Sequence, residues 1–207
     1  MTAQITLCVI DDDLSVRESM RALLESAGYR VMDYASSNAF LASPALRSGC
    51  LIADIRMPEM DGLQLQEELG KRGIDIPVII MTGHGDVPLA VRAMRAGAMD
   101  FIEKPFGDDV MLASIRRALD IGRRVHNQME EARTAQSLLA LLTRRERHVL
   151  DQLVAGRSNK VAAYELGISP RTIEIHRARI MDKMKARSLS ELVRTAIAAA
   201  RLAGSAG

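Results

Sequence analysis

The feature that most restricts the fold is the alternation of short apolar segments with segments of helical character in residues 1–120. The apolar segments are 5–10, 51–53, 78–81 and 99–102, with a weaker one at 29–34. The helical segments that follow them are 14–27, 37–46, 63–69, 88–96 and 108–119. Five strands that alternate with five helices predict a doubly wound α/β fold with a five-stranded parallel sheet.

Charged and hydroxyl residues follow four of the predicted strands. They are Asp11, Asp12 and Asp13 after the first, Asp54 after the third, Thr82 after the fourth and Lys104 after the fifth. The carboxyl ends of parallel strands meet at one edge of the sheet, where ligands bind. Carboxylates that repel one another need a hard cation, and their oxygens favour Mg²⁺. A carboxylate can also attack phosphorus, and a lysine and a hydroxyl can then neutralise the phosphoryl oxygens.

Each of these residues also has an ordinary structural interpretation. One of the three aspartates, Asp13 in our interpretation, is expected to cap the next helix. Asp54 can be a solvated turn carboxylate, Thr82 a strand residue and Lys104 a surface charge. Their coincidence at matching strand ends favours a shared site.

Four segments resemble the receiver domain of two-component response regulators. They are VIDDD (9–13), IADIRMPEMDG (52–62), IIMTGHGD (79–86) and DFIEKPF (100–106), and their order and spacing fit over about 120 residues. The resemblance implies the strand order 2-1-3-4-5 and makes Asp54 the phospho-acceptor. It implies a Mg²⁺ site with Asp12 as a direct ligand, Asp11 as a supporting acid, and Asp54 and the Arg56 carbonyl as further ligands.

The same resemblance assigns the switch residues. Thr82 matches the switch hydroxyl, Lys104 the phosphate-binding lysine and Phe101 the rotating aromatic residue. It also implies a cis bond between Lys104 and Pro105. We expect a homodimer of the phosphorylated receiver, formed through Val91, Arg95 and Asp100, in which Arg95 of one chain meets Asp100 of the other.

Charge divides the chain into two unlike parts. Residues 1–120 hold 12 Lys and Arg against 18 Asp and Glu, whereas residues 121–207 hold 16 against 8. This asymmetry predicts an acidic module joined to one that meets a polyanion. We place the receiver at 1–121, a helical linker at 122–141 and a DNA-binding domain at 142–207. A flexible linker is the alternative.

The last module has the signals of a small all-α helix-turn-helix domain. Thr143 and Glu146 form a capping-box pattern, and Ser158 and Ser169 are predicted N-caps of the next helices. A generic pair of packed helices is the alternative. In the third helix, Ile173, Ile180 and Met184 form one apolar stripe, so the opposite face is free to enter a DNA groove. Our candidate DNA contacts are Lys160, Arg171, Thr172, Glu174, Ile175, Ala178, Arg179 and Lys183.

Residues 142–188 resemble the LuxR-type DNA-binding domain, through the opening T-x-R-E, the S-N-K and the S-P-R-T-I-E-I-H. Segments 82–106 and 176–189 are similar to FixJ-type regulators of nitrogen fixation. That resemblance implies a haem-containing sensor histidine kinase as the phosphate donor, and promoters of nitrogen-fixation and microaerobic genes. An activator of this kind also meets RNA polymerase. Related regulators of other pathways share the same sequence motifs.

Two other functions fit the sequence less well. A Mg²⁺-dependent phosphohydrolase would need a substrate cap and an acid near Asp54, but Arg56 stands two residues later and no cap insertion is present. The second alternative is a DNA-binding protein that acts without phosphorylation and carries a vestigial receiver. It is disfavoured because the acidic residues, the hydroxyl and the lysine of the site are all present, namely Asp11, Asp12, Asp54, Thr82 and Lys104. We therefore expect no enzyme activity beyond the receiver's own phosphotransfer and dephosphorylation. Without an apolar run of about 20 residues, we expect a cytoplasmic protein and no membrane partner.

Overall fold

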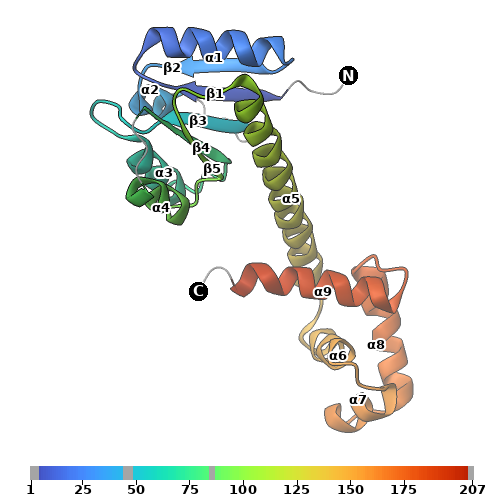
Figure 1. The fold of residues 1–207 in the computed structure, drawn as a ribbon. Helices are drawn as coiled ribbons and strands as arrows, with labels where there is room; N and C mark the ends of the chain where they lie inside the picture. The colour runs from blue at the N-terminus through green and yellow to red at the C-terminus, as the bar shows by residue number, and fades with distance from the viewer. Residues whose placement is uncertain (1–4, 44–48, 84–86, 205–207) are drawn as a thin grey trace. The chain divides into compact units, whose positions relative to one another are not determined.

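The computed structural model describes residues 5–43, 49–83 and 87–204, and the chain forms two compact units, residues 1–124 and 125–207. The first unit contains β1 (Thr6–Ile10), β2 (Arg30–Tyr34), β3 (Cys50–Asp54), β4 (Val78–Thr82) and β5 (Asp100–Glu103). All four strand pairings are parallel, and the order is β2-β1-β3-β4-β5 (Figure 1). The predicted fold class and strand order are confirmed.

Helices cover both faces of this sheet (Figure 1). They are α1 (Leu14–Ser26), α2 (Ser37–Ala42), α3 (Gly62–Lys71), α4 (Val87–Arg95) and the beginning of α5 (Asp108–Ala140). The helix predicted over 37–46 ends earlier, at Ala42, because Ser43 is extended, and positions 44–46 lie outside the described residues. Helices α1, α3 and α4 match the expected segments with ends shifted by one or two residues, and α5 begins as expected but continues through the linker segment to Ala140.

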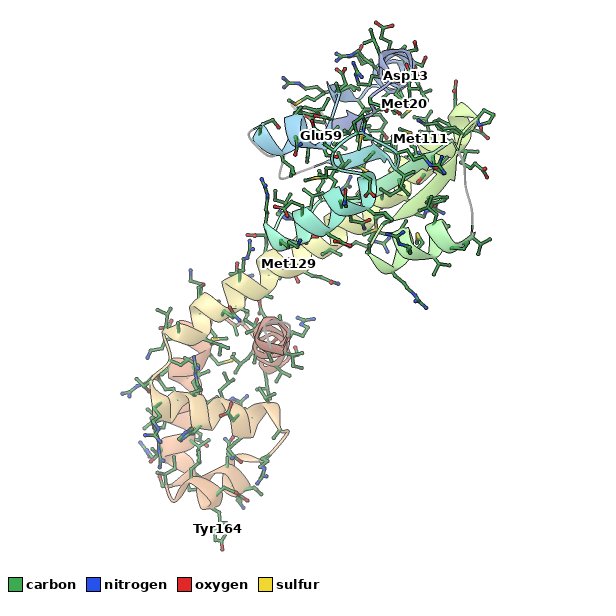
Figure 2. All side chains as sticks on the ribbon, turned by 90° about the vertical axis from the view of Figure 1, so that its left-hand side faces the viewer. Asp13, Met20, Glu59, Met111, Met129 and Tyr164 are labelled. Atoms are coloured by element: carbon green, nitrogen blue, oxygen red, sulfur yellow. The ribbon has the colours of Figure 1, made fainter. Side chains whose placement is uncertain are left out.

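Two apolar layers result from the alternation of side chains along the buried strands. Cys8 and Ile10 of β1 pack with residues of α2 and α3, whereas Leu7 and Val9 pack with residues of α1 and α5. Met20 of α1 and Met111 of α5 belong to this second layer (Figure 2). The sheet is therefore buried on both sides, and polar chemistry is left to the ends of its strands.

The second unit is helical, as predicted. It contains α6 (Arg144–Val154), α7 (Asn159–Leu166), α8 (Pro170–Lys183) and α9 (Leu189–Gly204). Thr143 forms a capping box with Glu146, and the side chains of Ser158 and Ser169 cap α7 and α8. The predicted apolar stripe of Ile173, Ile180 and Met184 is buried in the core of this unit.

The linker segment is helical and belongs to α5, which runs from Asp108 to Ala140. Met111 and Ile115 pack in the core of the first unit, and Leu138 and Leu139 pack against the core of the second. The side-chain amide of Gln136 donates to the Ala199 carbonyl of α9, at 3.4 Å. One helix thus contributes to the core of each unit. Within the described parts of the chain, no helix is long and apolar enough to span a membrane.

Candidate functional site

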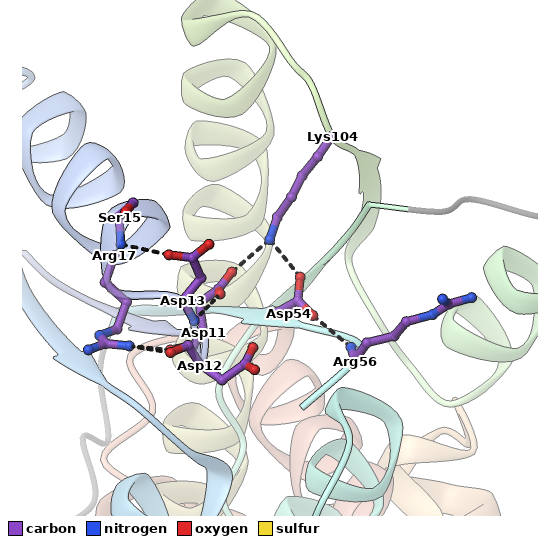
Figure 3. A network of polar contacts seen from close by, with 8 residues as sticks. All are labelled: Asp11, Asp12, Asp13, Ser15, Arg17, Asp54, Arg56 and Lys104. Atoms are coloured by element: carbon purple, nitrogen blue, oxygen red, sulfur yellow. Dashed lines mark hydrogen bonds and ion pairs between the residues drawn. The ribbon is translucent and has the colours of Figure 1, made fainter. Parts of the chain in front are cut away.

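A lysine and two aspartates from three strand ends meet at the carboxyl edge of the sheet (Figure 3). The Lys104 Nζ donates to Asp11 Oδ2 at 2.7 Å and to Asp54 Oδ1 at 2.6 Å. Asp11 and Asp54 are buried and the Lys104 side chain is 21% exposed, so the three charges lie in a largely desolvated group. The structure brings together residues that are 93 and 50 positions apart in sequence.

The environment shifts the ionisation of this group. Burial raises the pKa of Asp11 above its ordinary value, although the Lys104 ammonium and the Asp13 N–H act in the opposite direction. Burial of the Lys104 ammonium acts against its charge, but hydrogen bonds to Asp11 and Asp54 outweigh this and raise the pKa of Lys104. Lys104 is therefore held as a cation between two carboxyl groups.

The Asp54 carboxylate is held by the loop that follows Asp54 in the chain. The Arg56 N–H donates to Asp54 Oδ2 at 2.7 Å, so both oxygens of this carboxylate have a partner. A Cβ added at Gly62 would lie 2.5 Å from the Asp54 carbonyl oxygen. Gly62 therefore permits the start of α3 to approach the strand end that carries Asp54.

Arg17 of α1 was missed by the sequence reasoning. Its Nη1 donates to the carbonyls of Asp11, at 2.8 Å, and Asp12, at 3.1 Å, and its Nε lies 3.3 Å from Asp33 Oδ2. It thereby ties the acidic loop to α1 and β2. Asp13 caps α1 as predicted, accepting from the Ser15 N–H at 2.8 Å.

Asp12 has an exposed side chain, unlike the buried Asp11 and Asp54. Among the described residues, no three His, Cys, Asp or Glu side chains are arranged to hold a metal ion. The Lys104 ammonium lies between Asp11 and Asp54 (Figure 3). The donor set itself, carboxylates and the Arg56 carbonyl, is the oxygen chemistry that Mg²⁺ prefers.

Thr82 lies at the same edge, whereas Phe101 pairs with Ile80, two positions before Thr82, in the body of the sheet. The strand register pairs Asp54 with Met81, which places Thr82 one position beyond it, fully buried. Phe101 on β5 is half-buried against the layer formed with α2 and α3. The Lys104–Pro105 bond is cis, as expected.

The three residues expected at a dimer face have different environments. Val91 and Arg95 are exposed on α4. The Asp100 carboxylate already has partners in its own chain, because Arg117 forms an ion pair with it and the Ser114 hydroxyl donates to it at 2.6 Å. An Arg95 from a second chain would have to share this carboxylate with Arg117.

On the second unit, α8 presents a mixed polar and apolar surface. Arg171, Glu174, Ile175 and Ala178 line one shallow hollow, and Ile175 is 48% exposed. Lys160 and Arg179 are exposed, whereas Thr172 is half-buried and its hydroxyl lies 2.8 Å from that of Ser169. Tyr164 on α7, which the sequence reasoning did not select, is 89% exposed (Figure 2).

Lys183, one of the candidate DNA contacts, has an ammonium that is bound within the domain. It donates to Glu146 Oε2 at 2.7 Å, and Glu146 is a buried residue of α6. Hydrogen bonds from Lys183, then from Thr143, lower the pKa of Glu146 to about 2. Lys183 thus ties α6 to α8, and its contact with DNA stays a prediction.

The fold and its site define a class of protein: a receiver unit with an acidic pocket and lysine, followed by a helix-turn-helix unit. Comparison with known proteins agrees. Residues 7–116 match the response regulator receiver domain, and residues 140–196 match the luxR family of bacterial regulatory proteins. The chain belongs to the response regulators that combine these two domains, and it is a FixJ-like member that regulates transcription.

The relatives span nearly the whole chain. The transcriptional regulatory protein FixJ of Azorhizobium caulinodans is 50% identical over 96% of this chain and 95% of its own length. The structure of the response regulator StyR gives a TM-score of 0.80 at 41% identity, covering 93% of this chain and 98% of its own. Full-length FixJ from B. japonicum gives 0.60 at 47% identity, covering 97% and 99%.

Proposed function

We propose that the protein is switched by transfer of a phosphoryl group from a sensor histidine kinase to Asp54. The observation that carries this proposal is the Lys104 ammonium, held 2.6 Å from the Asp54 carboxylate at the carboxyl edge of the sheet. At this distance the Lys104 ammonium can neutralise the charge of a phosphoryl group attached to Asp54. Thr82, one position beyond the partner of Asp54 on β4, supplies the switch hydroxyl.

Mg²⁺ is part of this proposal. The residues that would hold it are Asp11, Asp12, Asp54 and the backbone carbonyl of Arg56. When bound, the ion supplies charge neutralisation for the phosphoryl oxygens. Arg17 supports these residues by holding the carbonyls of Asp11 and Asp12. Lys104 keeps the carboxylates from repelling one another before the ion arrives.

We further propose that α8 enters the major groove of promoter DNA. Ile175 and Ala178 offer apolar contacts to thymine methyl groups, and Arg171 and Arg179 reach guanine or phosphate. Glu174 accepts a hydrogen bond from cytosine. The exposed Lys160 on α7 and the Thr172 hydroxyl contact the DNA backbone. The single observation that favours this face is the hollow lined by Arg171, Glu174, Ile175 and Ala178.

The wider role rests on resemblance to FixJ proteins. We propose that the chain acts in the cytoplasm, activates nitrogen-fixation and microaerobic genes together with RNA polymerase, and dimerises when phosphorylated. The dimer face comprises Val91, Arg95 and Asp100. The only enzymatic chemistry of the protein is the gain and loss of its own phosphoryl group. A regulator of the same architecture that controls another pathway is the second candidate.

Intact-mass measurement tests the phosphorylation directly. The full-length protein is incubated with Mg²⁺ and a small phosphodonor, with and without EDTA. We expect the mass of one phosphoryl group on the wild-type protein, none with EDTA, and none on Asp54→Asn, which keeps the shape but loses the nucleophile. Asp54→Asn protein that gains phosphate at the wild-type rate would overturn the assignment.

A further inference from the structure

Arg17 of α1 joins the acidic loop, residues 11–13, to an aspartate on β2. Its Nη1 donates to the carbonyls of Asp11, at 2.8 Å, and Asp12, at 3.1 Å (Figure 3). Its Nε lies 3.3 Å from Asp33 Oδ2. The Arg17 side chain is 12% exposed and that of Asp33 is 22% exposed. A continuous line of contacts, largely shielded from water, therefore runs from β2 to the acidic loop.

The sheet places Asp33 for this contact. Asp33 lies on β2 and pairs with Val9 of β1, which packs in the layer formed with α1 and α5. The next residue, Tyr34, accepts a hydrogen bond through its carbonyl from the Asp11 N–H at 3.2 Å. The end of β2 thus reaches the acidic loop by two routes, one through the backbone and one through the side chains of Asp33 and Arg17.

The charges around Asp33 are balanced in pairs. Arg21, one helical turn after Arg17 on α1, also forms an ion pair with Asp33 and lies 3.7 Å from Glu25. Glu25 can therefore offset the charge of Arg21. In the part of the chain that the structure describes, Arg17 has no ion-pair partner other than Asp33. Asp33 is thus the group that balances the cation bound to the acidic loop.

The charge of Arg17 has two opposite consequences for a divalent cation. Its hydrogen bonds to two carbonyls hold the acidic loop in one conformation, which favours binding of an ion by Asp11 and Asp12. Its positive charge, if it were unbalanced, would weaken the attraction of these carboxylates for Mg²⁺. A guanidinium can donate to carbonyls and to a carboxylate at the same time, because its donors form a planar fork. Asp33 therefore allows Arg17 to hold the loop with little net charge.

We propose that Asp33 is a positioning residue for the Mg²⁺ site, which acts through Arg17 by fixing its orientation and cancelling its charge. This inference rests on the Mg²⁺ site that we propose at Asp11, Asp12 and Asp54. Asp33 does not bind the ion itself, since both of its carboxylate oxygens are paired with arginines of α1. It deepens the proposed function because it sets how tightly the receiver binds the ion that phosphorylation needs.

A titration with Mg²⁺ tests this without any phosphoryl transfer. The amide chemical shifts of the unphosphorylated full-length protein are followed by NMR, and the same spectra show whether each variant is folded. We expect Asp33→Asn to raise the Kd for Mg²⁺ about tenfold, the lower end of the cost of losing a residue that supports a metal ligand. Asp33→Glu should lose less affinity, because it keeps the negative charge beside Arg17. In an Arg17→Met background, Asp33→Asn should change the Kd by less than about twofold, because its target is gone.

Arg21→Met is the matched control, since Arg21 binds the same carboxylate but has no hydrogen bond to the acidic loop among the described residues. Its Kd for Mg²⁺ should equal the wild-type value, even if its stability falls. Glu25→Gln, which removes a carboxylate from α1 without touching Arg17, should also keep the wild-type Kd.

Three results would overturn the role of Asp33. They are a wild-type Kd in Asp33→Asn, an equal loss of affinity in Arg21→Met, and a loss from Asp33→Asn that is the same with and without Arg17. The last result would mean that Asp33 acts on the ion by its charge alone. If the wild-type protein shows no saturable binding of Mg²⁺, the proposed Mg²⁺ site fails instead.

Discussion

At the scale of single residues, Arg17 makes contacts whose loss is measurable. It donates to two carbonyls of the acidic loop and lies beside Asp33, with 12% of its side chain exposed. Arg17→Met should therefore lower the free energy of unfolding of the first unit by about 2 kcal/mol. Urea unfolding measures this, with the exposed Arg30→Met on β2 as the control. Equal unfolding midpoints for Arg17→Met and wild type would contradict the contacts.

Glu146 gives a second prediction at this scale, one that depends on pH. Lys183 and Thr143 lower its pKa to about 2, below its ordinary value of 4.5, so folding favours the charged form. The resulting stabilisation is complete above about pH 4.5 and is lost as the pH falls toward 2. Lys183→Met should cost the second unit about 2 kcal/mol at pH 6 and clearly less at pH 3. A cost that is the same at both pH values contradicts this ion pair.

At the scale of elements, α8 is predicted to read DNA through its exposed face. Arg171→Ala should weaken binding to all sequences and reduce the dependence of log affinity on log salt concentration by about one unit. Ile175→Ala should change which sequences are preferred, because an apolar contact to a base is lost. Arg133→Ala on α5 removes the same charge outside this face and is the control. If neither Arg171→Ala nor Ile175→Ala alters the footprint, α8 is excluded from the groove.

The elements also show how far the sequence predicts this molecule. The strands, the caps and the meeting of Asp11, Asp54 and Lys104 follow from periodicity and from the geometry of parallel strands. The partners of Arg17, Lys183 and Asp100 do not follow from the sequence pattern, because long side chains find their partners across packed elements. Lys183 illustrates this: its helix position allows a phosphate contact, but Glu146 of α6 binds it. Arg17 gives no signal because it donates to backbone carbonyls.

At the scale of the whole molecule, phosphorylation is predicted to bring two chains together through α4 and β5. Val91→Asp and Arg95→Glu should each leave the phosphorylated protein monomeric, because the first places charge at an apolar position and the second reverses the charge that is expected to meet Asp100. Sedimentation with and without phosphodonor measures this, and both variants should still accept phosphate. Ala113→Asp, an exposed position on α5, is the control. Normal dimerisation of both variants would place the interface elsewhere.

The central claim, that phosphoryl transfer to Asp54 controls DNA binding, is tested most directly by one affinity measurement. A duplex selected from random sequences by the phosphorylated protein is titrated with wild-type protein and with Asp54→Asn, each with and without Mg²⁺ and acetyl phosphate. We predict that the donor tightens wild-type binding by about tenfold or more, through pairing of two DNA-binding units, and leaves Asp54→Asn unchanged. Equal affinity of wild-type protein before and after phosphorylation, or an equal gain by Asp54→Asn, would contradict the claim.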